Sequence, residues 1–218
     1  MVEITETPPQ DILDELALLR IQLEQEVPPK VLDKNLLIAT WNIRAFGDLT
    51  KKWDSEDDDS PKRDFRALLE ITEIVSRFHV MAIQEVRENI RSLRYMLKLL
   101  GLHWGVILTD VTKGSQGNFE RLAFLFDTRV VQLSGLRAPA ELDNAPRTIF
   151  DKGSDTGHFY DQIAWFTGEK NSPILSMKFL NAGYFDFLQA TLKGLNLTKN
   201  ALSWRISDHY PCGGRSFR

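Results

Sequence analysis

The hydrophobic residues of this chain recur at spacings typical of helices and of buried strands. Within the first 30 residues, four of them lie three or four positions apart and predict an amphipathic helix that ends before Pro28: Ile12, Leu16, Leu19 and Leu23. The apolar runs 36–39 and 80–83 each predict a buried strand. A helix between them is predicted to start at Ser60, because its hydroxyl can cap backbone N–H groups and Pro61 fits the first turn. This order of elements predicts two adjacent parallel strands.

Polar residues at the ends of these two strands form a first candidate site. Asn42 follows the first strand, and Glu85 follows the second. The ends of two adjacent parallel strands lie at the same edge of a sheet. We therefore expect Asn42 and Glu85 to share one site, although they are far apart in the sequence.

The segments that flank these elements are rich in charge. The acidic run 54–59 is interpreted as a solvated loop, because it lacks the ligand spacing and the glycine that a calcium loop requires. A helix is predicted to start at Asn89 and to stop at Gly101. Its basic residues lie on a different face from its leucines, and we interpret them as a solvated surface in preference to a phosphate-facing one: Arg91, Arg94 and Lys98.

The middle of the chain predicts a hairpin and then loses its regular pattern. Strands are expected over 104–109 and 121–126, joined by a turn-rich segment, and a short strand is expected over 129–133. Arg121 begins the second strand of the hairpin. Its side chain has two alternative roles, contact with a phosphate or a surface ion pair. Pattern returns only at 159–166, which favours a strand with Asp161 near its start.

Composition and charge narrow the classes of function. With 218 residues, 43% hydrophobic and 26% charged, the chain suits one domain with a sizeable core. Its net charge of -3 argues against strong nonspecific binding to polyanions, although a local basic patch is compatible with it. The single cysteine, Cys212, cannot form an internal disulfide, and neither a leader sequence nor an apolar run of membrane-spanning length is present. These features predict a cytoplasmic protein without a membrane span.

Residues 206–211 carry the most distinctive polar pair of the chain. Asp208 offers a hard metal ligand, and the adjacent His209 offers a group for proton transfer. An Asp-His pair is common in solvated loops, so its significance depends on the strand-end motifs elsewhere in the sequence.

Taken in order, the polar motifs resemble those of the endonuclease/exonuclease/phosphatase superfamily, which includes DNase I-like nucleases and inositol polyphosphate phosphatases. The motifs that carry the resemblance are Trp41-Asn42-Ile43, Gln84-Glu85-Val86, Glu120-Arg121, Tyr160-Asp161-Gln162 and Ser207-Asp208-His209. The resemblance covers residues 35–133 and 142–211, and bacterial members of uncertain substrate are the most similar. It implies a DNase I-like α/β fold of four layers, in which two mixed sheets pack face to face between helices.

The resemblance also implies a function, the divalent-metal-dependent hydrolysis of a phosphoester by a nuclease or a phosphatase. It assigns the metal, Mg²⁺ or Mn²⁺, to three ligands: Glu85, Asn42 and Asp208. It assigns three side chains to catalysis: His209, Asp161 and Arg121. In this interpretation His209 contacts the phosphate or the attacking water, and Asp161 orients it. The implied partner is a phosphoester substrate, with nucleic acid among the candidates.

The chain departs from the family pattern at two places. A strand with a further histidine and a Gly-Asp-Phe-Asn motif are both absent before the Tyr160 strand, which indicates an internal deletion near 136–140 and predicts an impaired enzyme. The sequence thus predicts an N-terminal helix and linker (1–34), a main domain (35–211) and an atypical tail (212–218), which is expected not to form the apolar edge strand usual in the family. Two alternatives remain, a noncatalytic domain that binds metal or phosphate and a fragment without a stable fold.

Overall fold

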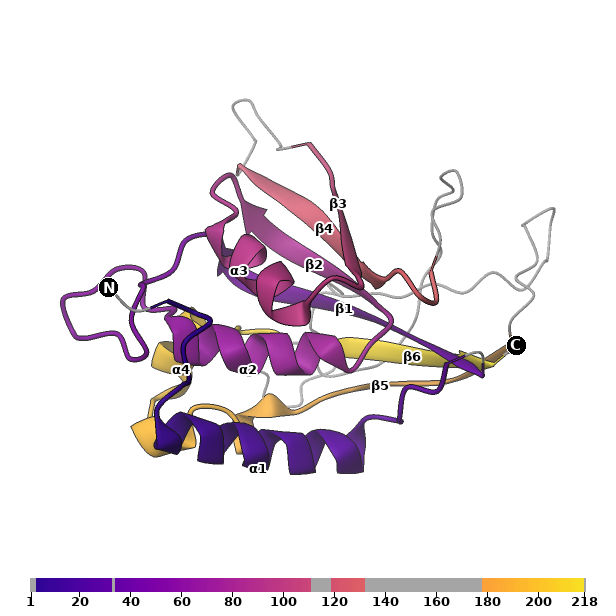
Figure 1. Ribbon diagram of the computed structural model, residues 1–218, viewed down its shortest axis with the longest axis horizontal. Helices are drawn as coiled ribbons and strands as arrows, with labels where there is room; N and C mark the ends of the chain where they lie inside the picture. The colour runs from indigo at the N-terminus through magenta and orange to yellow at the C-terminus, as the bar shows by residue number, and fades with distance from the viewer. Residues whose placement is uncertain (1–2, 33, 111–118, 132–177, 218) are drawn as a thin grey trace, which may run out of the picture.

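The computed structural model describes residues 3–32, 34–110, 119–131 and 178–217. These residues form an α/β fold with four α-helices and one mixed sheet of six strands, in the order β3-β4-β2-β1-β6-β5 (Figure 1). The α/β class predicted from the sequence is thereby confirmed. Asp161, the strand expected over 159–166 and the deletion expected near 136–140 lie outside the described residues.

The centre of the sheet is the predicted pair of parallel strands. β1 (Asn35–Phe46) pairs in parallel with β2 (Val80–Arg87), and α2 (Phe65–Ser76) connects them. The register is regular as far as Asn42 opposite Gln84 and shifts beyond it. The crossover therefore brings Asn42 and the end of β2 to the same edge of the sheet, as the order of elements predicted.

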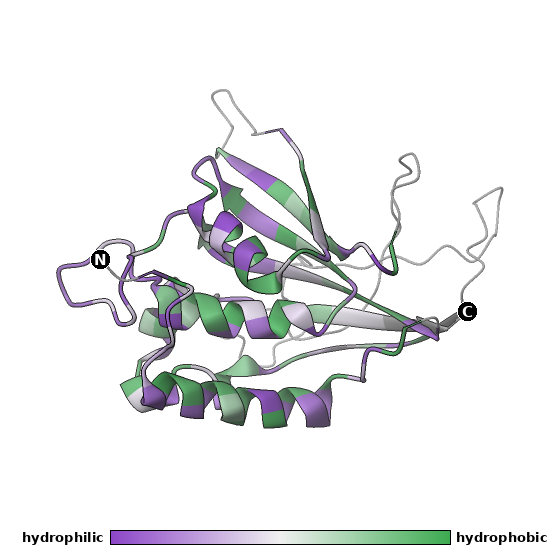
Figure 2. Ribbon diagram, in the orientation of Figure 1, coloured by the Kyte–Doolittle hydropathy of each residue, from purple (hydrophilic) through white to green (hydrophobic). Residues whose placement is uncertain are grey.

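The helices cover one face of this sheet. Alternate residues of β1 are buried on that face: Leu37, Ala39, Trp41 and Ile43. In Figure 1, α2 and α3 (Arg91–Leu100) lie against the sheet, and α1 (Gln10–Glu26) packs beside α2. The hydrophobic residues predicted on α1 are buried, and hydrophobic residues predominate on α2 (Figure 2). Thr40 and Asn42 alternate with the core residues of β1 and so lie on the opposite face.

The start of α2 corrects one prediction. The helix begins at Phe65 and not at Ser60, because Asp64 supplies its cap and accepts a hydrogen bond from the N–H of Ala67 at 2.9 Å. An aspartate immediately before the apolar run is as good a cap as a serine four residues earlier. At α3 the predicted start is nearly correct, since Asn89 Oδ1 accepts a hydrogen bond from the first helical N–H at 3.0 Å.

The predicted hairpin is confirmed. β3 (Trp104–Leu108) pairs antiparallel with β4 (Glu120–Asp127), and β4 also pairs antiparallel with β2. The short strand expected over 129–133 is wrong within the described part, because Arg129 and Val130 lie in a turn. The guanidinium of Arg129 folds back onto the buried Asp127 carboxylate, with N–O distances of 2.6 and 2.8 Å, and this ion pair favours the turn over an extended chain.

The tail corrects another prediction. β6 (Cys212–Phe217) is a strand inside the sheet, paired antiparallel with both β1 and β5 (Lys178–Tyr184). Pairing on both sides satisfies the backbone whatever the side chains are. At Gly213 an added Cβ would lie 2.7 Å from Cε1 of Phe78, so glycine is what lets that ring pack against the strand. Gly213 is therefore required by the packing of Phe78.

The segment between β5 and β6 contains the remaining elements. They are the short 3-10 turns η2 (Phe187–Gln189) and η3 (Lys193–Leu195) and the helix α4 (Lys199–Arg205). None of the helices in the described ranges combines the length and the apolar character needed to cross a bilayer.

Candidate active site

Glu85 lies at an interruption of the sheet. The pairing of β2 shifts with β1 beyond Asn42 and with β4 between Ile83 and Val86. The backbone of Glu85 takes a φ of 55°, a left-handed conformation that costs a residue other than glycine about 1–3 kcal/mol. Its Oε2 accepts a hydrogen bond from the N–H of Ala45 at 3.0 Å. Strain of this kind, which turns a carboxylate out of the regular pleat, is typical of functional positions.

The loop that carries Asp208 and His209 is fixed to the same end of β1. Ser207 Oγ donates a hydrogen bond to the carbonyl of Asn42 at 2.5 Å and accepts one from the N–H of His209 at 2.9 Å. The indole Nε1 of Trp41 donates to the carbonyl of His209 at 2.7 Å. These contacts bring two polar motifs from opposite ends of the chain together, as the resemblance implied.

Arg63 supports this junction from inside the protein, although no motif in the sequence singles it out. Its buried guanidinium donates to the carbonyls of Arg44 and Ala45 at 2.8 and 3.2 Å, and to those of Arg205 and Ile206 at 2.9 and 3.1 Å. Burial lowers the pKa of Arg63 to about 10, against the opposing effect of Asp64 and Glu85, so the side chain is charged at neutral pH. One cation thus joins the end of β1 to the segment before Ser207.

The oxygen atoms expected to bind a metal have no partners among the described residues. Asn42 Oδ1 and Asp208 Oδ1 are both buried, and neither accepts a hydrogen bond from the part of the chain that the structure describes. A buried acceptor without a partner costs about 1–3 kcal/mol, so such atoms require an explanation. Amide and carboxylate oxygens are ligands that Mg²⁺ prefers, and these two atoms fit such an ion.

The start of β4 adds charge of both signs to this edge. Arg121 lies opposite Val86 in the sheet. Among the described residues, its buried Nε has no hydrogen-bond partner, and its Nη2 makes one long contact, 3.5 Å, to the carbonyl of Glu88. Glu120 forms an ion pair with Arg87 at 2.9 Å. Burial and the negative charge of Glu85 raise the pKa of Glu120. The spare donors of Arg121 suit an anion, whereas those of Arg87 are partly used.

The predicted ligands do not form a closed cage. Within the described ranges, the ligand atoms of Glu85, Asp208 and His209 do not all lie within 4.8 Å of one another. An ion at this edge would therefore keep several waters, as Mg²⁺ commonly does with one or two carboxylates. Asp161, the residue expected to orient His209, lies outside the described residues.

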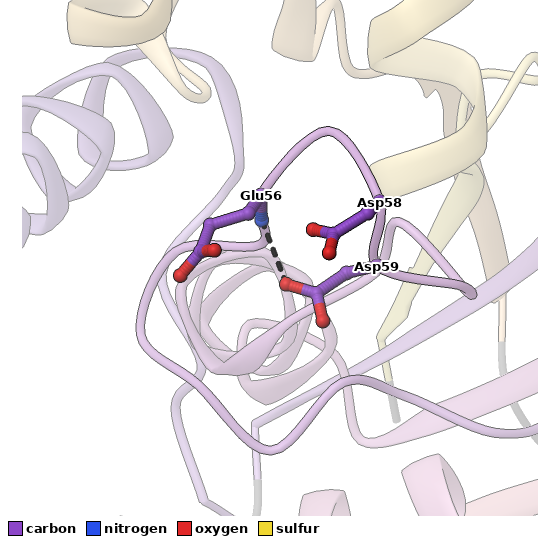
Figure 3. A group of neighbouring side chains, drawn as sticks. All are labelled: Glu56, Asp58 and Asp59. Atoms are coloured by element: carbon purple, nitrogen blue, oxygen red, sulfur yellow. Dashed lines mark hydrogen bonds between the residues drawn. The ribbon is translucent and has the colours of Figure 1, made fainter.

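A second acidic cluster lies in the run 54–59, which is a loop as predicted. Figure 3 shows the carboxylates of Glu56, Asp58 and Asp59 around one turn, with their nearest oxygens within 4.8 Å of one another. Asp59 Oδ2 accepts the N–H of Glu56 at 2.8 Å and pairs with Lys52 at 2.9 Å. Hydrogen bonds and an ion pair within the loop explain this arrangement, so we treat the cluster as a control site for cation binding.

Comparison of the chain with models of protein families finds no match, and no curated protein matches it. The case for this site rests on its geometry and on the resemblance of its motifs.

Proposed function

We propose that this chain is a divalent-metal-dependent phosphoester hydrolase of the endonuclease/exonuclease/phosphatase superfamily, with a DNase I-like four-layer sandwich as its complete fold. The observation that carries the proposal is a pair of buried oxygens, Asn42 Oδ1 and Asp208 Oδ1, which have no partner among the described residues and lie at the edge that also holds Glu85. A solvated strand end and a solvated loop would leave neither atom buried.

Each side chain at this edge has a role that its position supports. Glu85, Asn42 and Asp208 hold Mg²⁺ or Mn²⁺, and the bound ion would neutralise charge on the phosphoryl oxygens and on the leaving group. Arg121 binds the phosphate through its spare donors. His209, held by Trp41 and Ser207 through its backbone, exchanges a proton with the attacking water or contacts the phosphate, and Asp161 orients it.

A second candidate function is binding of metal or phosphate without turnover. It is favoured by the open arrangement of Glu85, Asp208 and His209, and by the missing histidine strand and Gly-Asp-Phe-Asn motif. The two functions share the metal site and differ in whether His209 performs chemistry.

Hydrolysis of bis(p-nitrophenyl) phosphate with and without Mg²⁺ tests the first function. We expect turnover that requires the metal and falls at least about a hundredfold in Glu85→Gln and in His209→Asn, with melting temperatures in the absence of metal that show both variants to be folded. Activity that survives both substitutions would overturn the assignment of these residues. Absence of turnover in the folded wild-type protein would favour binding without chemistry.

Metal binding is tested separately from turnover by the rise in melting temperature that Mn²⁺ or Mg²⁺ produces, because a ligand that binds only the folded state stabilises it. The rise should disappear in Glu85→Gln and Asp208→Asn and persist in Glu56→Gln, the matched control in the other acidic cluster. The reverse result would place the cation in the loop over residues 54–59 and remove the proposed metal from the candidate site.

A further inference from the structure

A basic groove of about 430 Å³ runs along the exposed face of α3. Four cations line it, together with Asn89, Ile90 and Tyr95: Lys51, Arg91, Arg94 and Lys98. No acidic side chain lines it. In a chain of net charge -3, this gathering of one sign of charge on one surface is a local departure from the overall balance.

Most of this positive charge is uncompensated. Arg91 pairs with Asp48, whereas Lys51, Arg94 and Lys98 form no ion pair among the described residues. All three are exposed, so their charges face solvent. A solvated helix face commonly carries charges of both signs, whereas the charged residues of α3 are all cations.

The groove begins beside the candidate site. Gly47 directly follows β1, and its ideal Cβ position lies 2.8 Å from Cβ of Arg87 and 3.2 Å from the carbonyl of Asn89. The N–H of Ser92 donates to the carbonyl of Gly47 at 2.9 Å, which fixes the start of α3 there. Arg87 is two residues beyond Glu85, so these contacts place the start of α3 near the end of β2 that carries Glu85.

The shape of the groove distinguishes between anions. Arg91 and Lys98 are seven residues apart on one helix, which corresponds to about 10 Å along the axis. A single phosphate spans much less, whereas successive phosphates of one nucleic acid strand follow one another along its length and would meet several of these cations. Tyr95, half-buried between them and packed edge-on against Phe65, offers part of a ring on which a base can stack.

We infer that this groove binds successive phosphates of a single nucleic acid strand, and that the phosphoester cut at the adjacent site belongs to that strand. The inference rests on the proposed function for the identity of the site, but not for the binding itself. It reverses the interpretation of Arg91, Arg94 and Lys98 as a merely solvated face. It also explains how a protein of net charge -3 can bind a nucleic acid strand, because the strand contacts only the cations of the groove.

The test is the affinity for a fluorescein-labelled twelve-nucleotide oligothymidylate, measured by fluorescence anisotropy in EDTA. The salt concentration is varied from about 25 to about 200 mM, because contacts between cations and phosphates weaken over this range. The charge reversal Arg94→Glu/Lys98→Glu should weaken binding by roughly 10- to 30-fold at 0.1 M salt and reduce the salt slope by about 1.4, the value for two phosphate contacts on a single strand. The control Lys34→Glu/Lys193→Glu makes the same charge change at exposed positions outside the groove and should change affinity by less than about twofold.

Two results would overturn the inference: no binding to the wild-type protein at 25 mM salt, or equal losses in the two double variants when thermal melts show both to be folded. Inositol hexaphosphate could also displace the labelled strand. If it does so at a far lower concentration of phosphate groups than unlabelled oligonucleotide requires, the groove binds a compact polyphosphate and the inference is wrong. Hydrolysis of bis(p-nitrophenyl) phosphate separates the two proposals. The groove variant should retain it, and its absence from wild-type protein that still binds the strand would refute the hydrolase and leave the groove standing.

Discussion

Arg63 offers the sharpest test of how the candidate site is held together. The variant Arg63→Met keeps a long side chain but removes four buried hydrogen bonds to carbonyls, two on β1 and two on the segment before Ser207. A hydrogen bond to a charged group contributes about 1.5–3 kcal/mol, and a buried carbonyl that loses its donor costs about 1 kcal/mol or more. Loss of the buried charge itself offsets part of this.

The balance of these effects predicts that Arg63→Met lowers the free energy of unfolding by about 4 kcal/mol, within the range observed when one partner of a buried ionic network is removed. For a protein of this size, that loss corresponds to a melting temperature lower by about 10 °C. Arg63→Lys keeps the charge but has three donors on one atom, and so should lose an intermediate amount.

Urea and thermal denaturation measure both variants, with Arg20→Met as the control. Arg20 is exposed and forms one ion pair, with Glu73, so its loss should cost less than about 1 kcal/mol. A cost for Arg63→Met no larger than that of the control would mean that Arg63 does not link β1 to the Ser207 segment. The argument that this cation positions the site would then fail.

Three other substitutions test the folded state away from the site. Burial lowers the pKa of His79 to about 4, and its Nδ1 accepts the N–H of Leu37 at 2.9 Å. The unfolded chain therefore gains this proton at a higher pH than the native protein, and stability falls as the pH falls below about 6.5. His79→Asn keeps an acceptor but does not titrate, so its deficit relative to wild type should narrow by about 2 kcal/mol between pH 7 and 4.5 in urea melts; a constant deficit would contradict this. Burial raises the pKa of Glu70 well above its usual value, which removes stability as the pH rises above the unfolded-state pKa. Glu70→Gln keeps an oxygen for the N–H of Leu192, and its melting temperature should be above that of the wild type at pH 8 but close to it at pH 4. A lower melting temperature for the variant at pH 8 would show that ionisation of Glu70 does not destabilise the folded protein. Gly213→Ala should cost about 1–3 kcal/mol in urea denaturation because of Phe78, whereas Gly183→Ala, its cross-strand neighbour with open space, should cost little; equal effects would show that the ring is not in the way.

The sequence predicts the central part of the fold well because the signals there are local. The apolar runs of β1 and β2 and the spacing of α1 each reflect burial of one side of an element. The parallel crossover follows from their order, and it is what brings Asn42 next to the end of β2. The position of Asn42 beside the end of β2 was therefore predictable, since it depends on topology and not on side-chain packing.

Other parts of the fold depend on contacts between distant residues, and the sequence does not reveal them. β6 is a strand because β1 and β5 pair with it on both sides and because Phe78 requires a glycine at position 213. Nothing in a polar, glycine-rich tail indicates either condition. Likewise, Asp64 caps α2 and also binds the guanidinium of Arg205 at 2.6 Å, so a long-range ion pair contributes to the choice of helix start.

The same distinction applies to the site. The groups to which we assign chemistry in the proposed function belong to motifs and can be found by inspection of the sequence, as with Glu85, Asp208 and His209. The groups that position them stand in no motif, because a buried arginine such as Arg63 is recognised only by the carbonyls around it. Ser207 belongs to a motif, but its bond to the Asn42 carbonyl becomes visible only when the two ends of the chain are brought together.

The buried acceptors at this edge bear on whether the site retains a ligand. Within the described ranges, Asn42 Oδ1 and Asp208 Oδ1 have no hydrogen-bond donor and Glu85 has a strained backbone conformation, each at a cost of about 1–3 kcal/mol. These costs are large beside a net stability of about 5–15 kcal/mol. Structural packing alone would favour apolar side chains at the first two positions and glycine at the third. Three unfavourable features within one edge are best explained by a ligand that compensates for them when bound, and a divalent cation with its phosphoester is the ligand whose chemistry matches the oxygens and the guanidinium found there.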